Sequence, residues 1–343
     1  MTRAIERVVS ESLDLAQDAR RFAFASSSQE REELRMRTPA LRCRRRSERP
    51  LPPLPEEDEL VSPRPGLYAR ARYWEGLSTP ERELHLLRTL ATRHPGWVFC
   101  GPSAALAHGL DVPPYCLSRP HVVELTRSHN GGNGLVAHCR VRGDVFEEAQ
   151  GMAVTSLERT LLDCLRAMDL RDGLAVSDSA LRQDLVTKDG FARYCHEIRR
   201  RGLRGVMRAR ETISHASARA RSCGESVLRG SVIELGYALP ELEVEVPSPA
   251  DPERMMRAPL AWRREDGGWL VAEFVEDAET DGSIEADRGE RARRTGKQGP
   301  MGPGASRGTG SKPTQTIRVG WAMLADDDLL AELLDSAGVP DAA

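Results

Sequence analysis

The stretch RMMRAPLAWRREDGGWLVAEFV, residues 254–275, decides the fold of the C-terminal part of the chain. Two largely apolar runs, at 256–262 and 269–275, flank a polar segment that contains a Gly-Gly pair. Apolar runs of this length on either side of a turn are typical of paired β-strands. The pattern therefore predicts a β-hairpin, with Pro259 on its first strand and Glu273 on its second.

Length and composition indicate the class of protein. The chain has 343 residues, which suggests two or three domains. Hydrophobic residues make up 40% and charged residues 29% of it, as in water-soluble globular proteins. No apolar run approaches the roughly 20 residues that span a bilayer, and the N-terminus lacks the apolar core of a signal peptide. We therefore expect a cytoplasmic protein that does not associate with membranes.

Charge is distributed unevenly, although the formal net charge is only -3. Residues 35–49 contain seven Arg and one Glu, and residues 191–221 contain nine Arg and two Glu. Residues 265–290 contain ten carboxylates and one Arg. Basic blocks can bind phosphate groups, and the alternative for each block is a solvated helix face.

The seven cysteines are widely spaced, and no Cys or His pair has the spacing of zinc ligands. We expect reduced, mostly buried cysteine side chains. No GxSxG, HExxH or GxGxxG motif is present. The sequence therefore offers no independent sign of nucleophilic, zinc-dependent or nucleotide-dependent catalysis.

Apolar periodicity and turn residues predict elements along the rest of the chain. Residues 276–315 are acidic and then rich in Gly, Ser and Pro, so we expect them to be disordered. The expected helices are 78–95 with Thr79 as cap, 103–110, 154–168 with a Thr155–Glu158 capping box, 223–237 and 326–338, with further helices before about 217. The expected strands are 59–74 as a hairpin around Pro65 and Gly66, 97–100, 121–125 paired with 135–139 as a hairpin, 242–246 and 316–321.

Three stretches together resemble a family that is common in actinobacteria. They are HPGWVFCGPSAALAHGL (94–110), VTSLERTLLDC (154–164) and the segment from CGESVLRGSVIELGY to APLAW (223–262). The N-terminal side of this family resembles AbiEi-type abortive-infection antitoxins. Its C-terminal side resembles very-short-patch-repair endonucleases, a branch of the PD-(D/E)XK fold. The resemblance covers roughly residues 57–340.

The resemblance implies an α/β protein. It would comprise an N-terminal winged-helix-like region, a mixed middle domain and a C-terminal PD-(D/E)XK-like mixed sheet with flanking helices. The implied segments are a basic, partly disordered arm or helices at 1–50, the winged-helix wing region at 51–77, an AbiEi-like middle domain at 78–217, and the nuclease-like domain at 218–343 with its disordered insert at about 276–315.

A winged-helix region implies contacts with double-stranded DNA. The segment ELVSPRPGLYAR (59–70) would be the wing, and the helices before it would include the one in the major groove. A mobile basic arm beside a structural wing is the alternative. The candidate phosphate-binding residues are Arg42, Arg44, Arg45, Arg46 and Arg64.

In the resembled nucleases a divalent metal is held by a helix Glu, an Asp that ends one strand, and an acid on the next strand. The helix motif GES matches residues 224–226, which makes Glu225 the helix acid. Glu273 matches the acid of the second strand. Pro259 stands at the position of the strand Asp, where it offers no ligand and no backbone N–H.

Two further departures from the nuclease pattern lie nearby. The expected Asp-Gly after Glu273 is Val275-Glu276, and no lysine occurs between residues 189 and 296. The low-complexity stretch replaces the helix that the family has between its last two strands. We therefore interpret Glu225 and Glu273 as remnant or capping carboxylates, and we expect no bound metal or other cofactor. Asp266 and Glu276 are the alternative ligands.

The sequence thus predicts a protein that binds DNA or a partner, in the manner of an AbiEi-like antitoxin or regulator, and that carries an inactive nuclease-like domain. A toxin or a defence-system protein is the expected protein partner. The alternative is a metal-dependent DNA endonuclease whose carboxylates have moved, with Glu225, Glu273 and Glu276 holding Mg²⁺. A third hypothesis is a scaffold that binds only protein.

Overall fold

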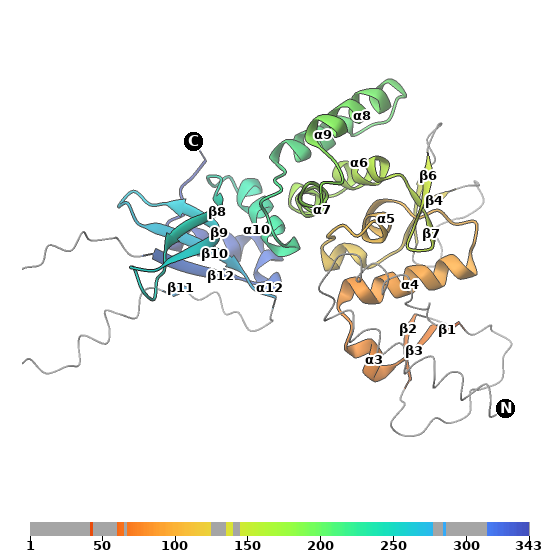
Figure 1. The fold of residues 1–343 in the computed structure, drawn as a ribbon, viewed down its shortest axis with the longest axis horizontal. Helices are drawn as coiled ribbons and strands as arrows, with labels where there is room; N and C mark the ends of the chain where they lie inside the picture. The colour runs from red at the N-terminus through yellow and green to blue at the C-terminus, as the bar shows by residue number, and fades with distance from the viewer. Residues whose placement is uncertain are drawn as a thin grey trace, which may run out of the picture. The chain divides into compact units, whose positions relative to one another are not determined.

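A computed structural model gives the fold of the chain (Figure 1). Its helices and mixed sheets make this an α/β protein, as predicted. Contacts divide the chain into two units, Met1–Asp163 and Cys164–Ala343, so the division falls inside the segment predicted as a middle domain, 78–217. The residues that the structure describes are 42–43, 60–64, 67–124, 135–139, 145–276, 284–285 and 314–342.

The first unit begins with the predicted hairpin. Strands β2 (Leu60–Arg64) and β3 (Leu67–Arg70) pair antiparallel, and β1 (Arg42–Cys43) pairs antiparallel with the other edge of β3. Residues 71–74, expected to continue the second strand, instead begin helix α3 (Ala71–Glu75). The helix allows Trp74 to pack against the cluster that includes Leu67. The rest of the predicted basic arm lies outside the described residues.

Helix α4 (Thr79–Arg93) confirms the predicted helix but not its cap. The N-cap is Ser78, whose backbone N–H donates to a carboxylate oxygen of Glu81 at 2.8 Å. Pro80 occupies the first turn, where a missing N–H costs nothing. Thr79 therefore lies inside the helix because the reciprocal Ser78–Glu81 contact satisfies the N-terminal backbone better.

Phe99 lies at the centre of the sheet of the first unit. It bridges Val122 in an antiparallel sense and Val154 in a parallel sense. The Phe99 N–H donates to Ala153 O at 2.8 Å, and the Thr155 N–H donates to Phe99 O at 2.9 Å. Of residues 97–100, predicted as a buried strand, only Phe99 forms β-bridges, and these join two pairs of strands. These pairs are β4 (His121–Glu124) with β5 (Val136–Cys139), and β6 (Phe146–Ala149) with β7 (Met152–Thr155).

The predicted hairpin between 121–125 and 135–139 is wrong. Strands β4 and β5 pair in parallel, from His121 opposite Val136 to Glu124 opposite Cys139. Parallel neighbours need a connection that returns the chain to the same end of the sheet, so a tight turn cannot join them. The connecting residues 125–134 lie outside the described part of the chain.

Helix α6 (Leu157–Ala167) begins later than the predicted capping box implies. The Arg159 N–H donates to Ser156 Oγ at 3.4 Å, whereas Thr155 Oγ1 bonds Thr160 Oγ1 at 2.7 Å. Thr155 remains in β7 because its N–H is needed by the sheet. In the described part of the chain before residue 217, the remaining helices are α5 (Gly101–Ala107), the 3-10 turn η1 (Pro114–Leu117), α7 (Leu170–Arg182), α8 (Lys188–Arg200) and α9 (Val206–His215).

A five-stranded mixed sheet forms the centre of the second unit, in the order β11-β12-β10-β9-β8. The predicted hairpin is confirmed, because β9 and β10 pair antiparallel with Trp262 opposite Leu270. Strand β10 pairs in parallel with β12 on its other side. The elements of this part are α10 (Cys223–Glu234), β8 (Glu241–Pro247), β9 (Met255–Arg263), β10 (Trp269–Phe274), β11 (Ile284–Glu285), β12 (Thr314–Val319), α12 (Trp321–Leu324) and α13 (Asp327–Ala337).

The predicted disordered insert, 276–315, is wrong in two places. Residues 284–285 form β11 against β12, and β12 begins at Thr314 rather than at residue 316. The Thr314 hydroxyl donates to Pro247 O at 2.6 Å, which fixes the start of the strand. The rest of the insert lies outside the described residues.

The two faces of this sheet have different neighbours. On β10, Leu270 and Ala272 belong to one apolar cluster and Trp269 and Val271 to another, as alternation along a strand requires. Helices α10, α12 and α13 contribute to the cluster of Leu270 and Ala272, so they cover that face, and Figure 1 shows α10 and α12 beside the sheet.

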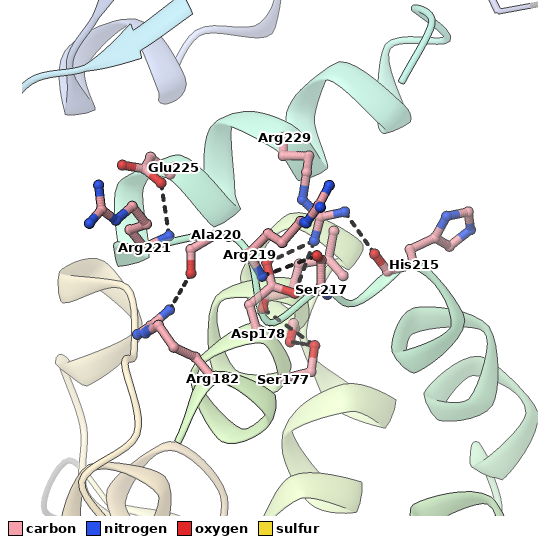
Figure 2. A network of polar contacts seen from close by, with 12 residues as sticks. Ser177, Asp178, Arg182, His215, Ser217, Arg219, Ala220, Arg221, Glu225 and Arg229 are labelled. Atoms are coloured by element: carbon pink, nitrogen blue, oxygen red, sulfur yellow. Dashed lines mark hydrogen bonds and ion pairs between the residues drawn. The ribbon is translucent and has the colours of Figure 1, made fainter. Parts of the chain in front are cut away.

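A buried ion pair positions α10 (Figure 2). The Arg229 guanidinium on α10 donates to both carboxylate oxygens of Asp178 on α7, at 2.9 and 2.7 Å. The two side chains are 5% and 0% exposed. Asp178 also accepts the Ser217 N–H at 2.6 Å, and Arg229 donates to His215 O at 2.7 Å. One charge pair thus ties together α7, the end of α9 and the segment that leads into α10.

We predict that Arg229→Met lowers the free energy of unfolding by about 3–5 kcal/mol, because it leaves the Asp178 carboxylate buried without its partner. Chemical denaturation measures the change. The matched control is Arg208→Met, which breaks the exposed Arg208–Asp169 pair (3.0 Å) and should cost under about 1 kcal/mol. Equal losses in the two variants would contradict the assigned role of the buried pair.

Candidate functional site

The candidate site lies where β8, β9 and β10 run side by side. Leu260 pairs with Ala272 across β9 and β10, so the next positions in the register are Pro259 and Glu273. Pro259 and Glu273 are thus the first residues beyond the last pair of the β9–β10 ladder. On the other edge of β9, the pairing of Ala258 with Val244 and of Leu260 with Leu242 places residue 243 opposite Pro259.

Glu243 is a site residue that the sequence analysis missed. Its carboxylate side chain is 8% exposed and lies 2.7 Å from Arg257 Nε and 3.6 Å from Arg221 Nε. Its φ is 54°, a left-handed conformation that costs a residue with a side chain about 1–2 kcal/mol. The run LEVEV gives no sign of this, because the position opposite Pro259 is known only once the strands are paired.

Glu225 lies in the first turn of α10 and accepts a backbone hydrogen bond there (Figure 2). Its Oε2 accepts the Arg221 N–H at 2.8 Å, and its own N–H donates to Ser222 Oγ at 3.2 Å. Burial raises the pKa of the Glu225 carboxyl, and the nearby Glu243 charge also raises it, while the Arg221 N–H and the charges of Arg221 and Arg182 act in the opposite direction. Glu225 therefore makes a helix-capping contact and lies near a second acid, Glu243.

Gly224 of the GES motif has a packing role. A Cβ placed on Gly224 would lie 2.2 Å from the ring of Phe274, the residue after Glu273 on β10. The Phe274 ring in turn contacts Trp321 edge to face at 4.8 Å between centroids. Only glycine thus allows the N-terminal turn of α10 to approach β10 this closely.

Glu273 is directed to the other face of the sheet. Alternation places it with Trp269 and Val271, whereas α10 covers the face of Leu270 and Ala272. Glu273 Oε2 lies 3.7 Å from Arg318 Nε on β12, its neighbour in the parallel register. The fold therefore places Glu225 and Glu273 beside different arginines.

Asp266 and Glu276, the alternative metal ligands, lie away from Pro259 and Glu273. Asp266 lies in the β9–β10 turn, where it accepts the Gly268 N–H at 2.8 Å. This turn is at the opposite end of β10 from Glu273. Glu276 is exposed, two residues beyond the end of β10. Within the described ranges, no group of three or more His, Cys, Asp and Glu side chains has an arrangement that holds a metal ion.

The acids of this region are paired with arginine charges instead. Arg221 and Arg257 accompany Glu243, and Arg318 accompanies Glu273. A guanidinium offsets the carboxylate charge that would otherwise attract a cation.

The predicted DNA-binding residues of the first unit are only partly described. Arg42 is in β1, and Arg44, Arg45 and Arg46 lie outside the described residues. Arg64 is at the end of β2, beside the turn, and its Nη2 donates to Ser118 O at 3.2 Å.

Glu83 on α4 is a buried acid near Arg64. Its side chain belongs to a residue that is only 6% exposed, and its Oε1 has no hydrogen-bond partner in the described part of the chain. Burial raises the pKa of Glu83 to about 7, although the Arg64 charge acts to lower it. The charge beneath the β2–β3 hairpin therefore changes near neutral pH.

Comparisons with known proteins identify a family. Two curated relatives, the uncharacterized proteins MT2308 and Rv2248 from two strains of Mycobacterium tuberculosis, are each 30% identical to this chain over 196 residues. The aligned region covers 56% of this chain and 69% of each relative. The chain belongs to the family of these mycobacterial proteins. No family model and no solved structure matches it, and no helix in the described residues is long and apolar enough to cross a membrane.

We predict that Gly224→Ala destabilises the protein by about 1–3 kcal/mol through the clash with Phe274. Alanine has a higher helix propensity than glycine by about 1 kcal/mol. Without a clash, the substitution would therefore stabilise the protein instead. Thermal and urea unfolding measure the sign of the change. Gly96→Ala is the control for the added methyl group alone, because Gly96 lies in a turn and, apart from its chain neighbours, nothing lies within 4 Å of its added Cβ. A stabilised Gly224→Ala variant would contradict the close approach of α10 to β10.

A second prediction concerns pH and Glu83. Because its pKa is about 7 in the folded chain and 4.5 ordinarily, the folded state binds more protons than the unfolded state between these values. Stability should therefore fall as pH rises through this window, by up to about 3 kcal/mol. Glu83→Gln should remove this dependence. The measurement is the free energy of unfolding of the wild type and of Glu83→Gln from pH 4 to pH 8. Parallel curves for these two proteins would contradict the assigned role of Glu83.

Proposed function

We propose that this chain is a DNA-binding regulator of the AbiEi-like kind whose nuclease-like unit does not hydrolyse DNA. The observation that carries the proposal is the set of residues around Pro259. This proline lies one position beyond the β9–β10 ladder, as Glu273 does, and opposite position 243 on β8, and the acids there are paired with arginines.

Hydrolysis of a phosphodiester by this kind of site needs carboxylates that converge on a divalent metal. Magnesium requires near-octahedral oxygen ligation, and a proline supplies no oxygen from its side chain. Glu225 accepts a backbone N–H, and Glu273 lies on the other face of the sheet. These features favour a binding role over a catalytic one.

Exposed arginines favour DNA as the ligand. The side chains of Arg221 and Arg257 are 63% and 62% exposed at one edge of the region, although both lie near Glu243. In the first unit, Arg64 stands beside the turn of the β2–β3 hairpin, the proposed wing. Arginine binds phosphate oxygens with two N–H groups at once, which suits contacts to a DNA backbone. A toxin or a defence-system protein is the proposed protein partner.

We predict that the full chain binds a mixed-sequence DNA duplex and that its affinity decreases steeply with salt. Each phosphate contact contributes a slope of about −0.9 to the plot of log affinity against log salt. Fluorescence anisotropy between about 50 and 200 mM salt should show a loss of at least roughly tenfold. No binding at the lowest salt would overturn the proposed function.

The same preparation tests the nuclease alternative. Supercoiled plasmid incubated with Mg²⁺ or Mn²⁺ should remain uncut by the wild type and by Glu273→Ala alike. Cutting that disappears in Glu273→Ala would replace the binding role with a catalytic one.

A further inference from the structure

The helical hairpin of α8 and α9 carries a dense set of arginines that the site described above does not use. Seven arginines occur between residues 188 and 215, and all seven are exposed. Figure 1 shows α8 and α9 as neighbouring helices. We call their exposed arginines the α8–α9 arginine surface.

Packing explains why these arginines are on the outside. Helix α8 buries Phe191, Cys195 and Ile198, and α9 buries Val206 and Ile213. These apolar positions recur at helical spacing, so the charged positions between them face solvent. The fold of the hairpin therefore depends on its apolar stripe and leaves the arginine charges available.

Local acids neutralise only part of this charge. Arg201 pairs with Glu197 one turn before it, and Arg208 pairs with Asp169 at 3.0 Å. Among the described residues, Arg193 and Arg200 on α8 have no ion-pair partner. They are seven residues apart on one helix, so they lie on nearly the same side of it, roughly 10 Å apart along its axis.

The other exposed side chains of the hairpin indicate which ligand it suits. Between residues 188 and 215 of the described chain, Met207 is the one large hydrophobic residue that is strongly exposed, at 56%. Protein interfaces have an apolar or aromatic centre, which this surface lacks. Single-stranded DNA stacks on exposed aromatic rings, whereas Phe191 is buried and Tyr194 is stacked on it. A duplex backbone requires only positive charge and hydrogen-bond donors.

We propose that the α8–α9 arginine surface binds the phosphate backbone of double-stranded DNA, as a contact separate from the β2–β3 hairpin and from the region around Pro259. The choice of ligand rests on the proposed function. The surface itself rests on the exposure and the spacing of Arg193 and Arg200, and on their lack of ion-pair partners among the residues that the structure describes.

The experiment compares salt slopes of duplex binding for the full-length chain. Arg193→Gln/Arg200→Gln should lower the slope by about two units, because each lost phosphate contact removes about one. Arg193→Lys/Arg200→Lys keeps the charge and should keep the slope. Arg93→Gln/Arg254→Gln removes the same charge from exposed positions elsewhere and should leave the slope unchanged. All four positions are exposed, so circular dichroism should show an unaltered fold.

The outcomes separate this inference from the proposed function. A wild-type slope in Arg193→Gln/Arg200→Gln overturns the inference and leaves the proposed function standing. An equal loss in Arg93→Gln/Arg254→Gln also overturns it, because the effect would then be one of net charge. A wild type without duplex affinity removes both. Tighter binding to single-stranded DNA, or equal competition by polyglutamate, would replace the duplex backbone with another ligand.

Discussion

The buried pair between Arg229 and Asp178 is the interaction on which the second unit depends. Removing two charges from water is costly, and only complete hydrogen bonding offsets the cost. Asp178 accepts hydrogen bonds at both of its oxygens, and Arg229 adds a bond to a backbone carbonyl, although Arg229 Nε has no hydrogen-bond partner in the described part of the chain. The pair fixes α10 against α7, so it also sets where Gly224 and Glu225 meet the sheet. Discrete charge pairing, rather than apolar packing alone, thus positions the candidate site.

Local chemistry made much of the fold predictable. Apolar runs and turn residues predicted the β9–β10 hairpin, most of β12, and helices α10 and α13, because side-chain patterns follow the repeat of each element. Helices α7 to α9 were expected only as unspecified helices, and α12 begins at Trp321, which was predicted to end a strand. Helix caps were predicted less well, since Thr79 and Ser78 are equally good candidates until the backbone is known. The parallel pairing of β4 with β5 was not predictable, because the apolar pattern shows two strands but not the direction in which they pair.

The residues of the candidate site were likewise predicted only in part. Glu225 and Glu273 were found from motifs along the chain, and Pro259 from its place between them. Glu243 was not found, because its relation to Pro259 exists only across two strands. The arginines that accompany these acids are also brought together by strand register and by the start of α10. A linear pattern identifies residue types, but only the pairing of strands shows which charges offset one another.

The left-handed backbone at Glu243 has a consequence for any attempt to build a metal site at this position. The Glu243 carboxylate lies 2.7 Å from Arg257 Nε, directly across from Pro259, where strand pairing is locally interrupted. An aspartate introduced at position 259 would lie beside a negative charge that Arg257 already balances, opposite a residue whose backbone is left-handed. A single substitution would therefore not bring free carboxylates together, and Arg257 and the backbone at residue 243 would have to change as well.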